Sequence, residues 1–412
     1  MQDLTTIKLN SPDVSQNAYE IYAALREQGG ILWSERHKAW LVSRYDYVKR
    51  VLLSPTSSVE KITPFVNQAG DNIHADMGFM HRIMEHWLPF MDPPEHTRLR
   101  LILQRSFTPR SLQAHETMIR EMARQVIDGF GGRREIEFLQ EFAFQFPALV
   151  ITHLFGLPGA EVDRIKQWSD GVAEFVLGSG KPDRYENSAA MMREMKDYFA
   201  ALVQRRSEQI AGKPGHQPET LLDELLAARE TVNGLTDEEI ISALILILFA
   251  APETTASMLT NSMLSLILNK PQLHELVSKP EMIGQVLDEL IRYEGPVPAV
   301  VRLAKEDMMI GDVTIKAGDR IFLLLKSANR DATQFAEPGK LDLDRGRSPH
   351  LGFGIGIHLC LGAPLARIEA RIAFEELFAR YKDFDLAEQE IVWRHELLAH
   401  SPHSLEITMI PA

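Results

Sequence analysis

The sequence predicts a mainly α-helical protein with small β-sheets, an α+β fold, with one long helix through its interior. Through the middle of the chain apolar residues recur every three or four positions, which is the period of a helix with one buried face. The run 240–251 is apolar on all sides, as is typical of a helix enclosed by a core. Helices are expected at 111–129, 136–155, 160–177, 186–211 and 219–230.

Composition narrows the class of protein. The chain has 412 residues, of which 45% are hydrophobic, and its length alone allows two or three domains. A formal net charge of −13 argues against nucleic acid or an anionic membrane as the main partner. A single cysteine excludes a disulfide framework and suits a reducing compartment. The N-terminus lacks the layout of a signal peptide and the apolar run 240–251 is too short to span a bilayer, so we expect a cytoplasmic protein without a membrane anchor.

The N-terminal segment carries both helix and strand signals. A helix is expected at 18–28, followed by a hairpin of strands 31–33 and 39–42 and by a helix at 45–53. Residues 55–92 show no clean period and are rich in large apolar side chains. A loop of that length is unusual in a compact domain unless it is functional, although it could also pack on the core.

Two further segments allow two interpretations each. His96 and Arg100 lie four residues apart on an expected helix and therefore share a face, which is either solvated or presented to a carboxylate. The loop from Gly178 to Pro182 separates two amphipathic helices and is either a lid hinge or an ordinary connection.

The long helix has a clear start and an unusual centre. Thr236 and Glu239 form a capping-box pattern that starts a helix reaching about Asn269, roughly 50 Å at 1.5 Å per residue. Pro252 removes one backbone hydrogen bond near its midpoint, at a cost of about 3 kcal/mol. Glu253 and the next residue place an acid and a hydroxyl just after this disruption, which favours chemistry over stability.

The only cysteine, Cys360, lies in a glycine-rich stretch before an expected helix at 364–374. A lone cysteine is usually a small buried hydrophobe, but a position before a helix N-terminus favours a thiolate. His358 is poorly placed to activate it as a nucleophile, and a zinc site would need further ligands with short spacings. A single axial thiolate suits haem iron.

The stretch 353–362 resembles the haem-binding loop of the cytochrome P450 family, and the resemblance extends over roughly residues 15–408. It implies a single domain, 1–412, and a haem b cofactor whose iron is bound by Cys360. The matching residues of the loop are Phe353, Gly354, Gly356, His358, Cys360 and Gly362.

The centre of the long helix resembles the family's oxygen-activation motif, which implies that Glu253 and Thr254 deliver protons and that Ala250 borders the haem. It departs from that motif because Ala251 replaces a glycine and Pro252 fills the variable position.

Other segments carry further family roles. The resemblance implies that His96, Arg100, Arg302 and His358 bind the haem propionates. Glu289 and Arg292 resemble the family's structural ion pair, with Arg345 as a third member, although surface helices often show the same spacing. Strands are expected within 309–325 and 391–408. The candidate pocket residues are Phe79, Trp87, Ala250, Val297, Val300 and Ser401.

The implied activity is a monooxygenase that inserts one oxygen atom from O2 into a small-to-medium hydrophobic substrate, free or carrier-tethered. A thiolate ligand favours O–O cleavage. A peroxide-driven enzyme and a non-catalytic haem sensor or carrier are alternatives that have no use for an acid–threonine pair. Electrons would come from a separate ferredoxin and reductase, and the protein is expected to be a monomer. Arginines implied to attract an acidic ferredoxin, unless they are structural, are Arg105, Arg110, Arg345, Arg347, Arg367 and Arg371.

Overall fold

The computed structural model describes residues 3–60, 62, 75–157, 161–177, 183–211, 217–229, 231, 234–346 and 348–412. Backbone packing groups the chain into two compact units. Unit 1 comprises residues 1–58, 116–146 and 254–412, and unit 2 comprises residues 59–115 and 147–253. The chain passes from one to the other several times, so neither unit is a continuous stretch of sequence. The single domain expected from the resemblance stays a prediction.

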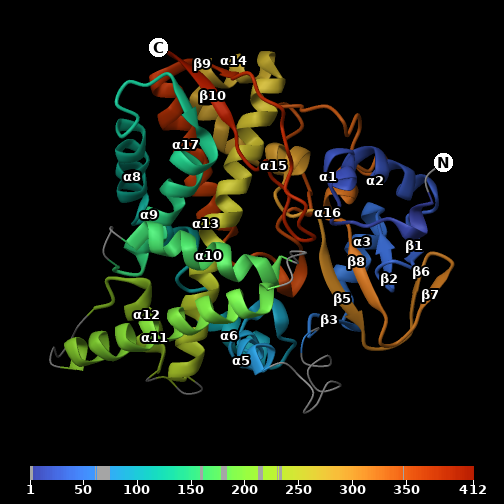
Figure 1. Cartoon of the computed structure of the whole chain (residues 1–412), viewed down its shortest axis with the longest axis horizontal. Helices are drawn as coiled ribbons and strands as arrows, with labels where there is room; N and C mark the ends of the chain where they lie inside the picture. Colours follow the sequence, from blue (N-terminus) through green and yellow to red (C-terminus); the bar gives the residue numbers. More distant parts are fainter. Residues whose placement is uncertain are drawn as a thin grey trace. The chain divides into compact units, whose positions relative to one another are not determined.

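A five-stranded sheet with the order β1-β2-β8-β5-β3 organises one part of unit 1 (Figure 1). The hairpin of β1 and β2 confirms the prediction, and Trp33 and Trp40 face each other across it with ring centroids 5.3 Å apart. β2 pairs in parallel with β8, while β5 is antiparallel to both β8 and β3. The strands are β1 (Ile31–Ser34), β2 (Ala39–Val42), β3 (Ser57–Ser58), β5 (Val300–Ala304) and β8 (Arg320–Leu323).

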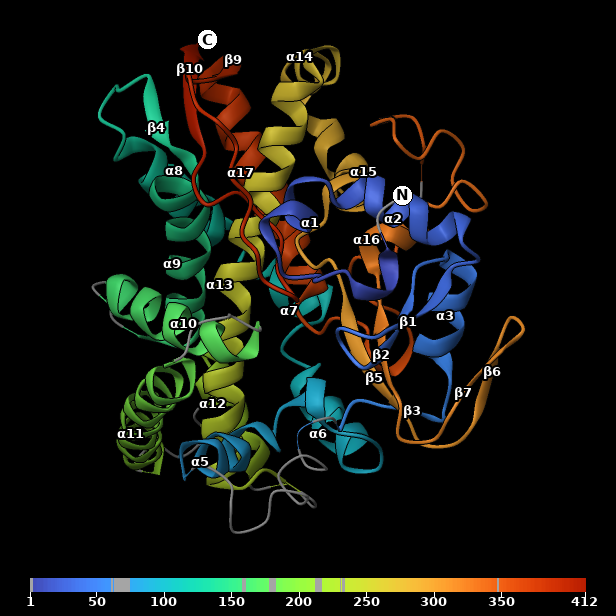
Figure 2. The same cartoon turned by 45° about the vertical axis from the view of Figure 1, so that its right-hand side comes forward.

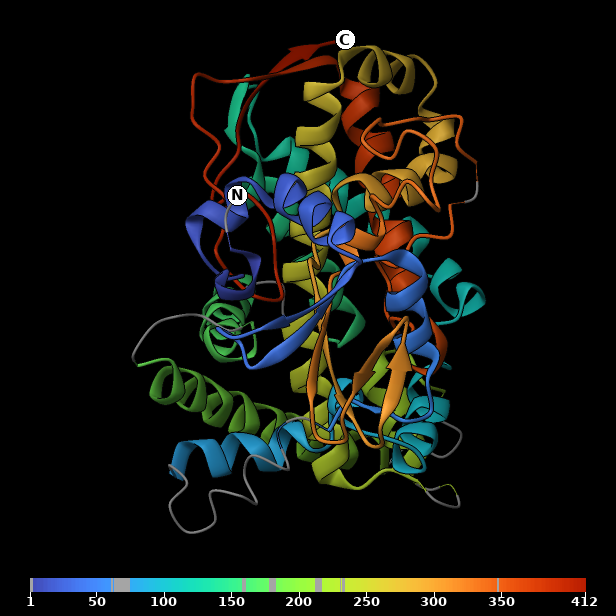
Figure 3. The same ribbon diagram turned by 90° about the vertical axis from the view of Figure 1, so that its right-hand side faces the viewer.

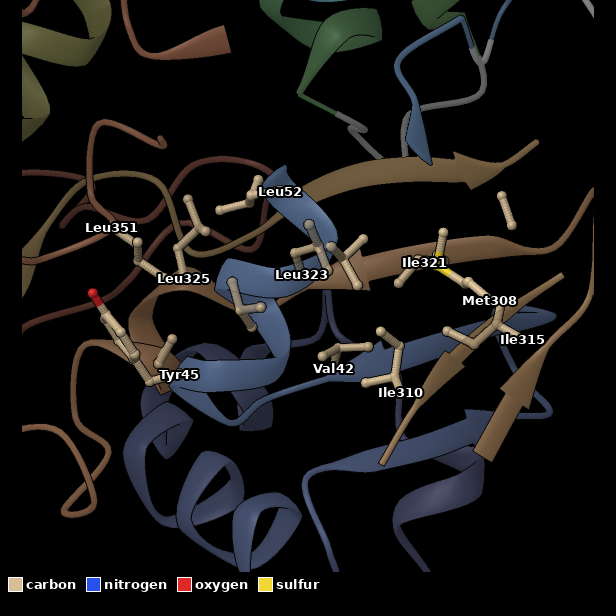
Figure 4. Close-up of a cluster of buried hydrophobic side chains, with 14 of the residues drawn as sticks. Val42, Tyr45, Leu52, Met308, Ile310, Ile315, Ile321, Leu323, Leu325 and Leu351 are labelled. Atoms are coloured by element: carbon tan, nitrogen blue, oxygen red, sulfur yellow. The ribbon is translucent and has the colours of Figure 1, made fainter. Parts of the chain in front are cut away.

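Helix α3 (Tyr45–Leu53) covers one face of this sheet (Figure 3). Its residues Val48, Val51 and Leu52 join Val42 and Leu323 in a cluster that excludes water (Figure 4). The hairpin of β6 (Met308–Ile310) and β7 (Val313–Ile315) adds its inward side chains to the same cluster.

A second sheet in unit 1, ordered β4-β10-β9, ties the C-terminus to the middle of the chain (Figure 2). Its strands are β4 (Glu135–Glu137), β9 (Tyr381–Leu386) and β10 (Glu406–Pro411). The remaining helices of unit 1 are α1 (Pro12–Gln16), α2 (Ala18–Glu27), α8 (Glu116–Asp128), α14 (Lys270–Ser278), α15 (Ile283–Glu294), α16 (Leu325–Ala328) and α17 (Ala363–Arg380), with 3₁₀-helices η1 (Leu4–Thr6), η6 (Pro280–Met282) and η7 (Gly356–His358) and a π-helix, η4 (Leu139–Phe144).

Helices are the only regular secondary structure among the described residues of unit 2. α10 and α11 pack closely because Gly171 leaves room: a Cβ there would lie 2.3 Å from the side chain of Met191. Trp168 adds an aromatic contact to Phe199 on the same interface. The helices are α5 (Ala75–Met84), α6 (Glu95–Leu103), α7 (Pro109–Gln113), α10 (Val162–Val176), α11 (Arg184–Ala211) and α12 (Leu221–Arg229), with the 3₁₀-helix η3 (Leu88–Phe90).

α9 (Gln145–Leu154) and α13 (Asp237–Leu268) contribute residues to both units. The capping box of α13 is confirmed, because the backbone N of Thr236 donates to Glu239 (2.8 Å) and the backbone N of Glu239 donates to Thr236 Oγ1 (3.2 Å). By length and hydropathy α13 could cross a membrane, but 78% of its most apolar window is buried within the protein, as expected of a core helix.

Several predicted elements differ from the structure. The predicted loop 55–92 contains α5 and η3, whose helical spacing was obscured by large apolar residues on other faces. Residues 61 and 63–74, Arg347 and the loop 178–182 lie outside the described residues. The predicted helix 111–129 is divided between α7 and α8, and 136–155 begins as strand and π-helix before α9. Within the predicted strands 391–408, only the last residues belong to a strand, β10. The rest contains one isolated bridge, between Trp393 and Pro402. The strand β9 was not predicted.

Candidate functional site

The loop before α17 holds Cys360 at the surface of unit 1. The backbone N of Cys360 donates to the carbonyl of Phe353 (2.9 Å), which closes the loop. Gly354 (φ +70°) and Gly356 (φ +78°) adopt left-handed backbone conformations that other residues rarely take, so these two glycines are required for the turn.

The position of Cys360 excludes the interpretation of a buried core cysteine. Its side chain is exposed, and the N-cap residue Gly362 follows two positions later, so the thiol lies beside the positive end of the 18-residue helix α17. Phe353 is covered by the guanidinium of Arg367 at 4.6 Å, which fixes the base of the loop. A thiol in such a position ionises more readily than a buried one.

Two of the predicted propionate ligands belong to unit 1. Arg302 lies in β5 opposite Ile321 of β8, and its side chain is buried, with Nη1 donating to the carbonyl of Val301 (3.0 Å). His358 ends η7, two residues before Cys360, and is half-buried. A buried guanidinium requires an anionic or carbonyl acceptor, which suits a carboxylate ligand.

The other two lie on one face of α6 in unit 2, as their spacing predicts. His96 is buried and Arg100 is half-buried. Burial and the nearby charge of Arg100 lower the pKa of His96, with Asp92 acting in the opposite direction. A lowered pKa favours the neutral form of His96, whose ring N–H can still donate a hydrogen bond to a carboxylate.

α13 is buried along most of its length, but a few residues near its centre are accessible, among them the half-buried Ala251. Leu246 and Ala250 are half-buried and Thr254 is exposed, at spacings of four residues along one face. Glu253 and Thr255, in contrast, are buried. The helix continues through Pro252. An accessible hydroxyl beside a buried acid is the arrangement that proton delivery to a bound ligand needs.

Sequence reasoning missed a buried carboxyl on α17. Glu369 accepts a hydrogen bond from Thr255 Oγ1 (3.3 Å), and burial raises the pKa of Glu369 to about 8. The sequence contains one signal of this burial: Leu365 and Ala373, each four positions from Glu369, place it on an apolar face of the helix.

The structural ion pair is confirmed in full. Arg292 Nε and Nη2 donate to the two carboxylate oxygens of Glu289 at 2.6 and 2.8 Å, and Arg345 Nε donates to the same carboxylate at 3.1 Å. Arg292 also donates to the backbone carbonyls of Asn329, Pro338 and Lys340. This set anchors the segment that leads to the Cys360 loop.

The candidate pocket residues differ in exposure. Val297 and Val300 are half-buried, whereas Ser401 is fully buried. Trp87 is buried and its ring stacks on those of Phe90 and Phe249. Phe79 lies under the guanidinium of Arg193, 4.6 Å away.

Most of the predicted ferredoxin-facing arginines of unit 1 are engaged by carboxylates. Arg345 contacts Glu289, Arg367 contacts Asp288 (2.9 Å) and Arg371 contacts Glu116 and Glu375. The surface of the Cys360 loop is instead apolar, because Ile357 and Leu359 are exposed and Leu53 of α3 is exposed close to Gly356.

The chemical types of these groups fit a haem. The exposed thiol at a helix N-terminus is of the kind that binds haem iron. The haem carboxylates would suit the buried guanidinium of unit 1, and the buried imidazole and the arginine on one helix face of unit 2.

Comparison with known proteins identifies the family of the chain. The model of the family described as Cytochrome P450 matches residues 7–399. The biotin biosynthesis cytochrome P450 of Bacillus subtilis is 31% identical over 94% of each chain. Vitamin D(3) 25-hydroxylase of Pseudonocardia autotrophica is 34% identical over 96% of this chain and 94% of its own. The solved structure of P450BioI in complex with an acyl carrier protein ligated to hexadec-9Z-enoic acid has a TM-score of 0.88 and 30% identity over 97% of this chain and 99% of its own.

Proposed function

Since this chain belongs to the cytochrome P450 family of haem-thiolate monooxygenases, which hold haem b through a cysteine thiolate, we propose that it inserts one oxygen atom from O2 into a small-to-medium hydrophobic substrate. Cys360 would bind the iron. His96, Arg100, Arg302 and His358 would bind the propionates. When bound, the haem supplies the oxygen-activating chemistry.

The residues of α13 carry the proton chemistry in this proposal. Thr254 is exposed, and in this proposal its hydroxyl donates a hydrogen bond to a ligand beside the helix or to a water. Glu253 is buried next to it in sequence and passes protons toward that hydroxyl. Ala250, one turn earlier on the same face, leaves space where a larger side chain would fill the site.

The observation that carries the proposal is the exposed Thr254 at the centre of a largely buried helix, directly after the buried Glu253. A peroxide-driven enzyme needs no proton delivery to O2, and a haem sensor needs no proton relay at all. The exposed threonine and its buried acidic neighbour therefore favour O2-dependent turnover.

The test compares two oxidant supplies on one preparation. The haem-loaded protein is given NADPH, a [2Fe–2S] ferredoxin and ferredoxin reductase, or hydrogen peroxide alone, with a panel of hydrophobic compounds selected by Soret shift. Product formation that requires NADPH and O2 supports the proposal. Product from peroxide alone, with none from the ferredoxin system, would contradict it.

The partner proposals rest on the same site. We infer a separate ferredoxin and reductase as electron donors, docking near the Cys360 loop, where Leu53, Ile357 and Leu359 are exposed. A carrier-tethered substrate stays a second option because a structural neighbour was solved with an acyl carrier protein. Comparing Soret shifts caused by a free fatty acid and by the same acid on a carrier protein separates the two. We also propose a cytoplasmic monomer, which size-exclusion chromatography and cell fractionation test.

A further inference from the structure

Two segments of the candidate pocket wall are joined by hydrogen bonds within unit 1. The backbone N of His400 donates to the carbonyl of Pro296 (2.8 Å), and the backbone N of Lys326 donates to the carbonyl of Pro298 (3.2 Å). These bonds hold the segment 296–299 between α16 and the segment 393–402. The candidate pocket residues Val297, Val300 and Ser401 lie in or directly beside these segments.

A buried polar network lies behind these two segments. Lys326 Nζ contacts the Glu294 carboxylate and lies 2.7 Å from His400 Nδ1. Tyr19 donates to the other oxygen of Glu294 (2.8 Å). Lys326, Glu294 and His400 are each less than 10% exposed, so water does not replace these partners.

The contacts fix the tautomer of His400. An ammonium group can only donate, so Nδ1 of His400 must accept from Lys326. Nε2 then carries the proton and donates to the carbonyl of Ser15 at 3.1 Å. The ring stacks on Trp393 with centroids 4.2 Å apart. A second proton would place an N–H on Nδ1 facing the ammonium of Lys326.

The charged groups around His400 oppose that second proton. Burial, followed by the charge of Lys326, lowers the pKa of His400, while Glu294 acts in the opposite direction. The other titratable groups in or beside this network are Tyr19, Tyr22, Arg330 and Glu396. A small cavity lined by Ser15, Ala299, Leu397 and His400 borders the ring.

We propose that His400 is a positioning residue for the substrate pocket: its neutral ring, which accepts from Lys326 and donates to Ser15, holds segment 393–402 in place beside segment 296–299. A second proton on Nδ1 breaks the bond to Lys326 and lets segment 393–402 move away from segment 296–299. This inference rests on the proposed function, because it assumes that both segments line the pocket.

The test measures ligand fit and not turnover. Imidazole and the bulkier 4-phenylimidazole are titrated into the haem-loaded protein by Soret shift from pH 5 to 8. The ratio of their Kd values compares a bulky ligand with a small one that binds the iron in the same way. His400→Gln cannot be protonated at this position, so its ratio carries only the pH dependence of the two free ligands. Divided by the His400→Gln ratio at the same pH, the wild-type ratio should show 4-phenylimidazole losing at least fivefold relative to imidazole in acid.

Lys326→Met supplies a second, independent variant. It removes the cation and leaves the Glu294 carboxylate 3.5 Å from His400 Nδ1, so the pKa of His400 rises and the loss of fit moves to higher pH. A merely structural role would not shift this midpoint. His395→Gln is the matched control, because its ring packs edge-on against His403 and it should follow the wild type.

The outcomes separate the two claims. If imidazole causes no Soret shift in the wild type, the haem assignment fails. If imidazole binds but the ratio varies with pH in the same way in the wild type and in His400→Gln, the positioning role is overturned. Should His400→Gln not fold, an unchanged midpoint in Lys326→Met overturns it alone.

Discussion

Replacing Glu369 with glutamine should stabilise the protein at neutral pH. Burial raises the pKa of this carboxyl from an ordinary 4.5 to about 8, so the folded protein holds a proton that the unfolded chain releases. The sign follows from linkage: between about pH 4.5 and 8 the folded state binds more protons, so the free energy of unfolding falls as pH rises. Glutamine keeps the shape and an oxygen that accepts from Thr255 without that cost.

The size of the effect follows from the width of the shift. Each pH unit above 4.5 lowers the wild type's free energy of unfolding by about 1.4 kcal/mol. The loss is about 3 kcal/mol at pH 7 and reaches a plateau above pH 8. We expect Glu369→Gln and wild type to be equally stable near pH 4.5 and to diverge by this amount at pH 7. The assay is equilibrium urea denaturation at pH 5, 6, 7 and 8.

A neighbouring carboxyl on α17 provides a control of opposite sign. Burial alone would raise the pKa of Glu376, but Arg124 and Arg120 contact its carboxylate and lower the pKa by more, so the net shift is downward. Its stabilising contribution is present at neutral pH and is lost as pH falls through its pKa. Glu376→Gln should therefore be less stable than wild type at pH 7, with a gap that closes in acid. A gap between Glu369→Gln and wild type that is constant over pH would refute the reasoning for Glu369.

The remaining predictions concern the site and its frame. Arg100→Ala and Arg302→Ala should each weaken haem retention, since an unpaired buried carboxylate is costly; unchanged haem occupancy and melting temperature in both would argue against the assignment. Thr254→Ala should consume NADPH with less product and more hydrogen peroxide, and full coupling would place the proton relay elsewhere. Pro252→Ala restores a backbone donor, so we expect a higher melting temperature together with poorer coupling. Arg292→Ala should destabilise by about 3–5 kcal/mol in urea denaturation because Glu289 loses its bidentate partner; a loss below 1 kcal/mol would contradict this.

The features predicted best from the sequence have strong local rules. The capping box of α13 and the hairpin of β1 and β2 depend on residues a few positions apart, and both are confirmed. The pairing of Glu289 with Arg292 also follows from helix spacing. Arg345 was found by resemblance, since its contact with Glu289 joins segments 56 positions apart.

The features missed depend on packing between distant segments. Glu369 becomes a buried acid only because α17 packs against Thr255 of α13, 114 positions away. His400 acquires its role from Lys326, Glu294 and Ser15, which come from three different elements. The helix α5 was overlooked because its buried face is made of methionines within a generally apolar segment.

The binding of iron by Cys360 is the central claim, and one spectrum tests it most directly. The reduced, haem-loaded protein in the presence of carbon monoxide should give the Soret band characteristic of thiolate ligation. The variant Cys360→Ala should lose that band, because the chain contains no other cysteine to replace it. An identical band in Cys360→Ala would contradict the assignment and, with it, the proposed function.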